Sequence, residues 1–369
     1  MLELIGVTKI SGGQTHIHET SLRLERGSLN VLLGPTLSGK TTLMRLMAGL
    51  EQPTSGEVRF DGKSVAGVPV QKRNVAMVYQ QFINYPAMTV YENIASPLKV
   101  SGERADVIDV EVRRAAELMR LSPYLDRLPL SLSGGQQQRT ALARAIVKKA
   151  SLVLLDEPLA NLDYKLREEL REELPKIFSA AGSIFVYATT EPSEALLLGG
   201  NTATLHEGRV SQFGKTISVY RNPRDLITAK TFADPPLNTV AAVRQGGHFV
   251  LGDAADGTAG RLPVPAHLAA VSDGRVTLAF QPHHVSLAEP YAGAPRLGVT
   301  TLVSEIAGSE SFVHVSHGTS RWVMLAHGVC DLDPGLKVEV FVDNRHLMAF
   351  GADGKALAPG ADGHAPGGM

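Results

Sequence analysis

The chain has 369 residues, of which 44% are hydrophobic and 20% charged, a composition typical of a folded globular protein rather than a disordered or fibrous one. Its 36 Lys and Arg residues balance 37 Asp and Glu residues, for a net charge of -1. Proteins that grip nucleic acid through its phosphates usually carry a basic excess, so we expect no nucleic-acid partner. A single cysteine, Cys330, excludes an intrachain disulfide framework, and the length allows two or three domains.

The sequence predicts a chain that does not cross a membrane by itself. It contains no run of about 18 consecutive apolar residues, the length that spans a bilayer. Residues 1–7 enter a strand-like pattern without the basic and apolar regions of a signal peptide. We therefore expect a soluble protein in the cytoplasm.

Strand-like and helical patterns alternate in the first part of the chain. Apolar runs at 29–33 and 152–155 are typical of strands, whereas 108–121 and 162–174 have helical periodicity. This alternation predicts an α/β domain with a parallel sheet covered by helices. The buried face of the last helix is predicted from apolar residues that recur every four positions, Leu166, Leu170 and Leu174.

The pattern changes near Pro235 and Pro236. From there to residue 351, short alternating segments are broken by Gly, Asp and Pro, which predicts a small all-β domain. We therefore expect a first domain at 1–235 and a second at 236–351. Residues 352–369 are rich in Gly, Ala and Pro and predict a flexible tail.

The adjacent His283 and His284 are a candidate metal pair. Neighbouring residues of a strand point to opposite faces of the sheet. We therefore expect the two rings not to share a metal ion.

A glycine-rich segment that fits G-x-x-x-x-G-K-[ST] follows the apolar run at 31–33 and opens a helical pattern at 43–49. In this context the backbone N–H groups at the helix N-terminus wrap phosphates. Lys40 would reach the terminal phosphates and the Thr41 hydroxyl would ligate Mg²⁺. The predicted nucleotide-binding residues are Gly34, Pro35, Thr36, Leu37, Ser38, Gly39, Lys40, Thr41 and Thr42.

Two carboxylates, Asp156 and Glu157, follow the apolar strand at 152–155. The strands of open α/β sheets present ligands at their carboxyl ends, so Asp156 is expected beside the phosphate loop, where it would hold Mg²⁺. Glu157 is placed one residue further on and would polarise an attacking water.

A second glycine pair stands at the start of another helical pattern, in the segment Ser133, Gly134, Gly135 and Gln136. Its backbone N–H groups and helix dipole favour an anion. Because the chain already has one phosphate loop, a second phosphate-binding segment is explained best if it binds the nucleotide of another subunit.

The order of these motifs, with Gln80 after a strand and residues 161–163 after the two carboxylates, resembles that of ABC-transporter ATPases. The resemblance implies that two such domains pair head to tail, with each ATP held between one phosphate loop and the partner's 133–136 segment. It also implies that Gln80 joins the Mg²⁺ ligands and that Asp163 lies at the dimer seam.

Further stretches resemble the ATPases of carbohydrate importers. Residues 78–94 resemble the region that couples to the permeases, and the β domain resembles the OB-like regulatory domain of maltose-type importers, at 232–238, 281–285 and 305–310. The resemblance implies a peripheral subunit on the cytoplasmic face of the inner (plasma) membrane. Its partners would be a second ATPase subunit, two permeases and, indirectly, a periplasmic binding protein.

Three residues depart from this family's pattern. Thr190 occupies the position of a histidine that acts as a switch, Ser11 that of an aromatic residue that stacks on adenine, and Leu37 that of a frequent glycine. Loss of one preorganised transition-state contact costs on the order of 10²–10³ in rate, and a lost aromatic–base stack costs roughly 1–3 kcal/mol of binding. These departures predict a weak nucleotide site on this chain.

The intact Glu157 and 133–136 segment favour an asymmetric heterodimer. In this hypothesis the chain's own site turns over slowly, while its 133–136 segment completes a competent site on a paralogue. The alternative is a homodimer in which the hydroxyl of Thr190, or His16 or His18, substitutes for the histidine.

At closer range, the phosphate loop, residues 79–86 and residues 188–192 resemble one of the two ATPase subunits of bacterial glycerol importers. Glycerol is therefore the favoured substrate. Two other classes remain open. One is a soluble ABC ATPase of repair or translation, which usually has two cassettes or a long coiled-coil insertion. The other is a regulatory module in which nucleotide occupancy, rather than turnover, is the function.

Overall fold

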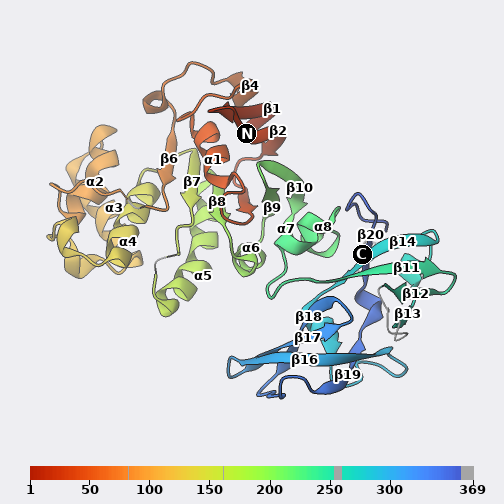
Figure 1. The fold of residues 1–369 in the computed structure, drawn as a ribbon. Helices are drawn as coiled ribbons and strands as arrows, with labels where there is room; N and C mark the ends of the chain where they lie inside the picture. Colours follow the sequence, from red (N-terminus) through yellow and green to blue (C-terminus); the bar gives the residue numbers. More distant parts are fainter. Residues whose placement is uncertain (82, 161, 253–259, 359–369) are drawn as a thin grey trace, which may run out of the picture. The chain divides into compact units, whose positions relative to one another are not determined.

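The computed structural model describes residues 1–81, 83–160, 162–252 and 260–358 (Figure 1). The chain divides into two compact units, Met1–Thr216 and Ile217–Met369. This division falls earlier in the chain than the predicted boundary at 235 and 236. The physical reason is α8 (Leu226–Thr231), whose Ala229 shares a small core with Ala279 and Phe350 of the second unit.

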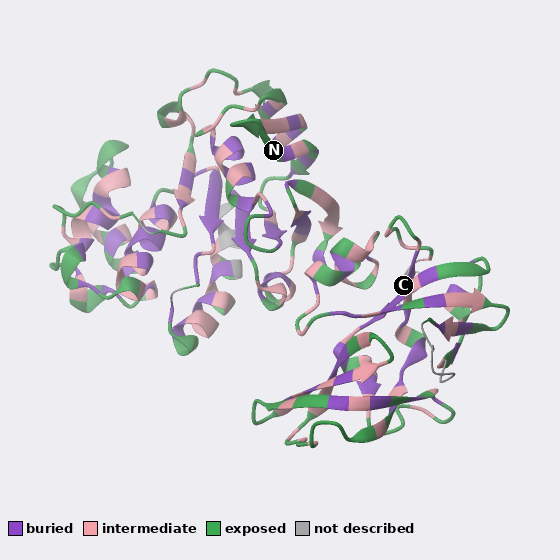
Figure 2. Cartoon of the chain, viewed as in Figure 1, coloured by how far each residue is buried: buried purple, intermediate pink, exposed green. Residues whose placement is uncertain are grey.

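The first unit is built on a six-stranded sheet in the order β10-β9-β3-β8-β7-β6. All neighbouring strands pair in parallel except β10, which pairs antiparallel with β9. Strands β7 and β8 are buried along their whole length (Figure 2), as expected for a parallel sheet covered on both faces. The predicted α/β class is thus confirmed. The strands are β3 (Leu29–Leu33), β6 (Val75–Val78), β7 (Leu152–Asp156), β8 (Ile184–Thr189), β9 (Asn201–His206) and β10 (Arg209–Lys215).

A second, antiparallel sheet of the first unit has the order β2-β1-β4-β5 and was not anticipated from the sequence. Helix α1 (Lys40–Ala48) shares one core with both sheets: its Leu43 and Met44 cluster with Leu4 of the second sheet and Leu154 of the first. The phosphate loop therefore leads into a helix that is buried between two sheets. The strands of this sheet are β1 (Leu2–Ser11), β2 (Gln14–Leu24), β4 (Ser55–Phe60) and β5 (Lys63–Ser64).

Three helices of the first unit, α2 (Val90–Val100), α3 (Ala105–Leu118) and α4 (Gly134–Val147), pack on one another (Figure 1). The remaining two are α5 (Tyr164–Ala181) and α6 (Pro192–Leu198). The helices predicted at 108–121 and 162–174 correspond to α3 and α5. The predicted stripe on α5 is buried, at Leu166, Leu170 and Leu174.

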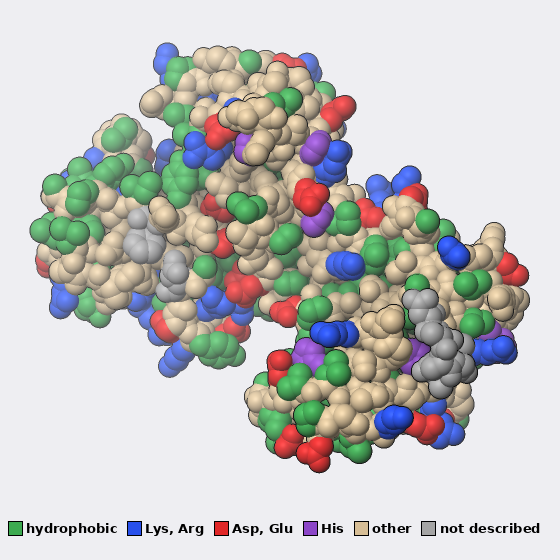
Figure 3. Space-filling model, in the orientation of Figure 1, with side chains coloured by type: hydrophobic (Ala, Val, Ile, Leu, Met, Phe, Trp, Pro, Cys, Tyr) green, Lys and Arg blue, Asp and Glu red, His purple; other side chains and the backbone are tan. Residues whose placement is uncertain are grey.

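Within the described residues, none of the helices combines the length and the apolar character that crossing a bilayer requires. On the face drawn in Figure 3, basic and acidic side chains of the described residues are interspersed. That face therefore presents no extended field of one sign.

The second unit contains two five-stranded antiparallel sheets, ordered β13-β12-β11-β14-β20 and β15-β19-β16-β17-β18. They share one core, in which Phe249 and Leu278 of the first sheet cluster with Val313 and Trp322 of the second. The predicted all-β region is confirmed, preceded by α7 (Thr216–Arg221) and α8. The strands are β11 (Asn238–Gln245), β12 (His248–Leu251), β13 (Arg261–Pro263), β14 (Gly274–Phe280), β15 (Val285–Ser286), β16 (Arg296–Ile306), β17 (Glu310–His317), β18 (Ser320–His327), β19 (Lys337–Val342) and β20 (Met348–Phe350).

The first part of the predicted flexible tail is ordered. The N–H of Leu357 donates to the carbonyl of Ala349 at 2.8 Å, and the N–H of Leu226 donates to the carbonyl of Gly354 at 2.8 Å. These bonds hold residues 352–358 against β20 and α8, a pairing that composition does not reveal. Residues 359–369 of the predicted tail lie outside the described residues.

His283 and His284 lie on a short 3₁₀ helix, Pro282–His284, rather than on a strand. Their rings do not point to opposite faces as those of strand neighbours would. The ring centroids are 4.2 Å apart. The ring of His346 stacks on His284 at 4.4 Å, and Nδ1 of His284 is buried without a hydrogen-bond partner among the described residues. Burial lowers the pKa of His284 to about 3, with His283 and His346 acting in the same direction and Asp343 opposing them.

We expect the second unit to lose stability as the pH falls below 6.5. The folded state keeps His284 neutral down to about pH 3, whereas an unfolded chain takes up the proton near pH 6.5. The unfolding free energy should therefore fall by up to about 1.4 kcal/mol for each pH unit below 6. Urea titrations followed by the fluorescence of Trp322, the chain's single tryptophan, report this unit.

His284→Asn should flatten this pH dependence, while His248→Asn, at an exposed position of β12, serves as the matched control. An equally steep pH dependence in His284→Asn would show that other groups cause it.

Candidate nucleotide site

The phosphate loop connects the buried end of β3 to α1, and its geometry depends on Gly39. This residue caps α1 with a φ of 103°, a conformation that side chains of L-residues rarely adopt. A Cβ at this position would lie 2.9 Å from Cδ1 of Ile17 and 3.2 Å from the carbonyl oxygen of His16. Glycine is therefore required here for both the turn and the close approach of β2.

Lys40 begins α1, and its side chain is 5% exposed. Its ammonium donates to the carbonyl oxygens of Gly34 at 2.7 Å and Pro35 at 3.1 Å. Burial lowers the pKa of Lys40, and the nearby carboxylates of Glu157 and Asp156 oppose that shift. The loop thus holds a desolvated cation that can exchange carbonyl partners for phosphate oxygens.

Leu37 has a φ of 66°, and its side chain is 95% exposed. A leucine in the left-handed region costs roughly 1–2 kcal/mol, which gives a physical reason why glycine suits this position. The structure thus places an exposed apolar side chain at the tip of the phosphate loop.

Asp156 ends β7, and its carboxylate accepts a hydrogen bond from the Thr41 hydroxyl at 2.7 Å. Burial raises the pKa of Asp156, while Thr41 and Lys40 act in the opposite direction. A buried carboxylate beside a hydroxyl is a set of hard oxygen donors, the ligand type that Mg²⁺ prefers. These residues fit the predicted magnesium site, with Gln80 as the further predicted ligand.

Glu157 follows directly and has a φ of 46°. Its N–H donates to the carbonyl of Ala188 on β8 at 3.0 Å, which fixes the turn. Its carboxylate accepts a hydrogen bond from Nε2 of Gln80 at 3.0 Å and lies 3.7 Å from Nζ of Lys40. The structure therefore brings together the ends of β6 and β7 and the phosphate loop.

A cleft of about 380 Å³ opens over these residues, within the size range of small-molecule sites. Six of the nine predicted nucleotide-binding residues line it: Thr36, Leu37, Gly39, Lys40, Thr41 and Thr42. Gln80 and Glu157 line it too, and Asp156 is connected to it through Thr41. Three further lining residues were not predicted from the sequence: Thr15, Glu207 and Gly208. A fourth, His16, was named only as a possible substitute for the switch histidine.

Thr15 and His16 come from β2, and Glu207 and Gly208 from the turn between β9 and β10. No motif links these segments to the phosphate loop, because they meet only through folding. A weak signal was available in the His-x-His pattern at 16 and 18, yet His18 does not belong to the lining residues.

The 133–136 segment does not line this cleft. Ser133 caps α4, its hydroxyl accepting from the N–H of Gln136, and the Gln136 side chain accepts in return from the N–H of Ser133 at 2.9 Å. This capping box fixes the helix start that carries Gly134 and Gly135. Within this chain the segment is separate from the phosphate loop, as a role toward a second subunit requires.

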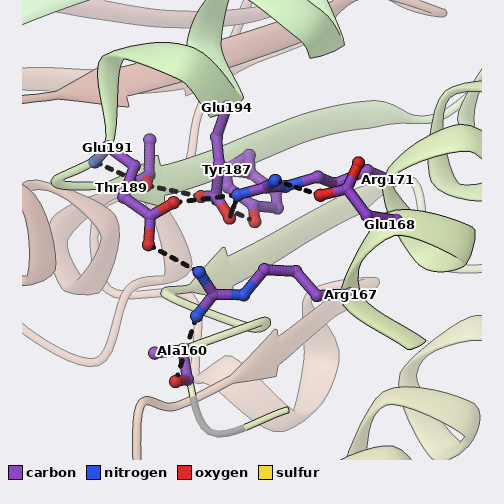
Figure 4. A network of polar contacts seen from close by, with 8 residues as sticks. All are labelled: Ala160, Arg167, Glu168, Arg171, Tyr187, Thr189, Glu191 and Glu194. Carbon is purple, nitrogen blue, oxygen red and sulfur yellow. Dashed lines mark hydrogen bonds and ion pairs between the residues drawn. The ribbon is translucent and has the colours of Figure 1, made fainter. Parts of the chain in front are cut away.

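Thr190 is exposed and is not among the described residues that line the cleft. The residues on either side of it are fixed in a polar network (Figure 4). The hydroxyl of Thr189 donates to Glu194 at 2.5 Å, and the N–H of Glu191 donates to the hydroxyl of Thr189 at 3.0 Å. The network thus fixes the backbone around Thr190 while leaving its side chain in solvent.

The same network reaches α5. The Glu191 carboxylate pairs with Arg167 at 2.9 Å and with Arg171 at 2.8 Å, while Arg171 lies 3.3 Å from Glu194 (Figure 4). The predicted seam residue Asp163 caps α5 by accepting from the N–H of Leu166 at 3.0 Å. Asn161, which begins the same 161–163 motif, lies outside the described residues. Ion pairs of Glu191 with Arg167 and Arg171 therefore join the turn that contains Thr190 to α5.

Comparisons with known proteins identify the family of the chain. Residues 17–160 match the ABC transporter family. The sn-glycerol-3-phosphate import ATP-binding protein UgpC of Cupriavidus pinatubonensis is 36% identical over 95% of this chain and 97% of its own length. The trehalose/maltose import ATP-binding protein MalK of Thermococcus litoralis is 42% identical over 68% of both chains.

A solved structure supports the same assignment for the first unit. A dimeric ATP-binding cassette in a post-hydrolysis state, bound to ADP and Pi, is 28% identical with a TM-score of 0.55 and covers 58% of this chain and 99% of the cassette. The chain therefore belongs to the ABC transporter family and, within it, to the ATP-binding subunits of importers.

Proposed function

We propose that this chain binds and hydrolyses ATP to energise an importer of a carbohydrate or polyol, with glycerol as the favoured substrate. The observation that carries the proposal is the meeting of Lys40, Thr41, Gln80 and Glu157 at one cleft, with Asp156 bonded to Thr41. Similarity along nearly the whole chain to the sn-glycerol-3-phosphate import protein supports a small polyol-type substrate.

The phosphate loop would bind the phosphates through N–H groups at the start of α1. Lys40 would release the carbonyls of Gly34 and Pro35 and donate to phosphate oxygens instead. Thr41, Asp156 and Gln80 would hold Mg²⁺, which would neutralise negative charge on the phosphates.

Glu157 would orient the attacking water. Its carboxylate already accepts from Gln80 and faces Lys40, so it lies at the phosphate end of the cleft. Gln80 connects the same point to residues 78–94, the predicted coupling region; Phe82 of that region lies outside the described residues. Through Gln80, binding or loss of the γ-phosphate could shift residues 78–94, the surface where permeases would dock.

The 133–136 segment would contact the nucleotide of a second ATPase subunit. Its glycines lie at the start of α4, where the helix dipole favours an anion. We propose that two permeases complete the membrane complex, so that this chain lies at the cytoplasmic face of the membrane. A binding protein outside the membrane would deliver the substrate.

The second subunit is proposed to be a paralogue, with this chain's own site hydrolysing slowly. Thr190, in place of the switch histidine, is exposed and stands outside the lining of the cleft. The alternative is a homodimer in which the Thr190 hydroxyl, His16 or His18 takes over. Of these two histidines, only His16 lines the cleft. A second alternative is a nucleotide-binding module whose own site scarcely hydrolyses.

The test measures phosphate release by the chain alone and mixed with a candidate paralogous ATPase subunit from the same organism. We expect little turnover alone and substantial turnover in the mixture. That turnover should survive Glu157→Gln in this chain, because the partner's own carboxylate would act. It should be lost with Gly135→Asp, which places a carboxylate at the start of α4, against the partner's phosphates.

Ordinary turnover by the chain alone, lost in Glu157→Gln, would establish the homodimer instead. A mixture that is unaffected by Gly135→Asp would refute a contribution of the 133–136 segment to the partner's site.

A further inference from the structure

We propose that a second pocket of the first unit, between the end of α1 and residues 63–75, binds a small amphiphilic anion. Such a ligand has one negative headgroup on a short apolar chain, as a medium-chain fatty acid does. The pocket has a volume of about 330 Å³, near the lower end of the range of small-molecule sites. Among the described residues it shares no lining residue with the nucleotide cleft, so the inference goes beyond the proposed function and does not depend on it.

The floor of the pocket is apolar and belongs to the core of the first unit. It is lined by Leu2 of β1, Met47 of α1 and Leu152 of β7, each 1% exposed. Phe60 and Val75 also line the pocket and pack, partly buried, against the same core. An apolar chain that enters the pocket would therefore contact buried hydrophobic side chains, and each methylene that it buries should tighten binding about fourfold.

The charged residues that line the pocket are all basic. They are Lys63, Lys72 and Arg73, and no Asp or Glu occurs among the described lining residues. Lys63 and Lys72 are exposed, and within the described part of the chain they take part in no ion pair. Their ammonium groups are therefore available to a ligand that brings its own negative charge.

Two acidic residues adjoin lining residues along the chain, and neither lines the pocket. Glu3 follows Leu2 on β1, where neighbouring side chains point to opposite faces of the sheet. The carboxylate of Asp61 pairs with the N-terminal ammonium of Met1 at 2.6 Å and with the guanidinium of Arg26 at 2.5 Å. No lining carboxylate thus offsets the basic side chains, and the pocket favours an anionic headgroup.

Arg73 holds one wall of the pocket in place. Its Nε donates to the carbonyl of Val68 at 3.0 Å, and its Nη2 donates to the carbonyl of Val65 at 2.6 Å. Its guanidinium packs on Gly49, where a Cβ would lie 2.1 Å from Cζ of Arg73. Residues 65–68 are in this way tied to the end of α1, so the wall that they form is held without a ligand.

The pocket and the nucleotide cleft lie at opposite ends of the same elements. Lys40 begins α1 and Met47 lies near its end, whereas Leu152 begins β7 and Asp156 ends it. The rise per residue of a helix and of a strand separates the two sites by roughly 10–13 Å along these elements. Each site can therefore hold its own ligand at the same time.

Titration calorimetry on the full chain, with octanoate as the probe, tests the assignment. We expect one octanoate to bind per chain, in the absence of nucleotide and at saturating MgADP. Hexanoate should bind about tenfold more weakly, because it lacks two methylenes. The uncharged 1-octanol should also bind more weakly than octanoate, and octylammonium should show no saturable binding, because the basic side chains repel it.

Variants separate the contribution of the headgroup from that of the chain. The double variant Lys63→Gln with Lys72→Gln should weaken octanoate binding on the order of tenfold and leave 1-octanol binding unchanged. The matched control, Lys99→Gln with Lys230→Gln, removes the same charge at two exposed positions outside the pocket and should change neither. Val68→Phe places a ring in the pocket and should weaken the binding of both probes, with thermal melting to verify the fold.

Four results would overturn the assignment. Absence of saturable octanoate binding would refute the site, and octylammonium binding as tight as that of octanoate would refute selection of an anion. Displacement of octanoate by MgADP would place the probe in the nucleotide cleft instead. Octanoate binding that is unchanged both in the Lys63 and Lys72 double variant and in a folded Val68→Phe would place it elsewhere on the chain.

Discussion

Thr190→His is expected to raise the ATP turnover of the purified chain on the order of 10²-fold, the rate effect of one preorganised transition-state contact. An imidazole at this position can reach further than a threonine hydroxyl and can donate a hydrogen bond to charge that develops on the γ-phosphate. The substitution should be tolerated because the Thr190 side chain is exposed. The flanking Thr189 and Glu191 would still be held by Glu194, Arg167 and Arg171.

Phosphate release at saturating MgATP measures this effect, with ADP affinity measured in parallel. Thr190→Asn is the matched control, because it introduces a polar side chain of similar size without an imidazole. Glu157→Gln in the histidine background should abolish the gain, since the water would no longer be oriented. If Thr190→His leaves turnover at the level of the unmodified chain, the missing histidine does not explain a slow site.

Lys40→Ala should weaken nucleotide binding by at least about 100-fold. The residue supplies a charge-assisted contact to the phosphates, and its loss removes the only lysine or arginine among the described residues that line the cleft. The Lys40 side chain is 5% exposed, and its ammonium donates to the carbonyl oxygen of Gly34. Both ADP and pyrophosphate should be affected, because both bind through their phosphates.

Lys149→Ala is the control for this prediction, because its side chain is 66% exposed in a surface ion pair with Glu111. Lys40→Arg should give an intermediate loss, since it keeps the charge but replaces a compact ammonium with a planar guanidinium. Circular dichroism melting verifies that each variant is folded. Normal ADP binding by a folded Lys40→Ala would refute the assignment of the phosphate site.

Local features of the fold were predictable where a few neighbouring residues carry the cause. The turn from β3 to α1 follows from the glycines of the phosphate loop, and the stripe of Leu166, Leu170 and Leu174 places α5 against a core. Asp156 and Glu157 lie beside the phosphate loop because strands of a parallel sheet present their carboxyl ends at the same edge. For the phosphate loop and the stripe on α5, the cause lies within a few neighbouring residues of the chain.

Features that join distant segments were not predictable in the same way. The N-terminal antiparallel sheet covers α1 from residues whose strand pattern is irregular, with register shifts between β1 and β2. The division after Thr216 depends on α8 packing against β14 and β20, and not on the prolines at 235 and 236. His283 and His284 were assigned to a strand because a 3₁₀ turn leaves little periodicity in three residues.

By itself the sequence determined the α/β and all-β classes, the phosphate loop and the order of carboxylates and helix starts around it, because spacing along the chain encodes each of them. Only the tertiary structure decided which residues complete the cleft. Thr15, His16, Glu207 and Gly208 reach the phosphate loop through close backbone packing of β2 and the β9–β10 turn. Thr190 is excluded from the lining in the same way, by its place after β8 and the network that fixes its neighbours. Contacts of this kind depend on how separate strands pack, and no local pattern of residues records them.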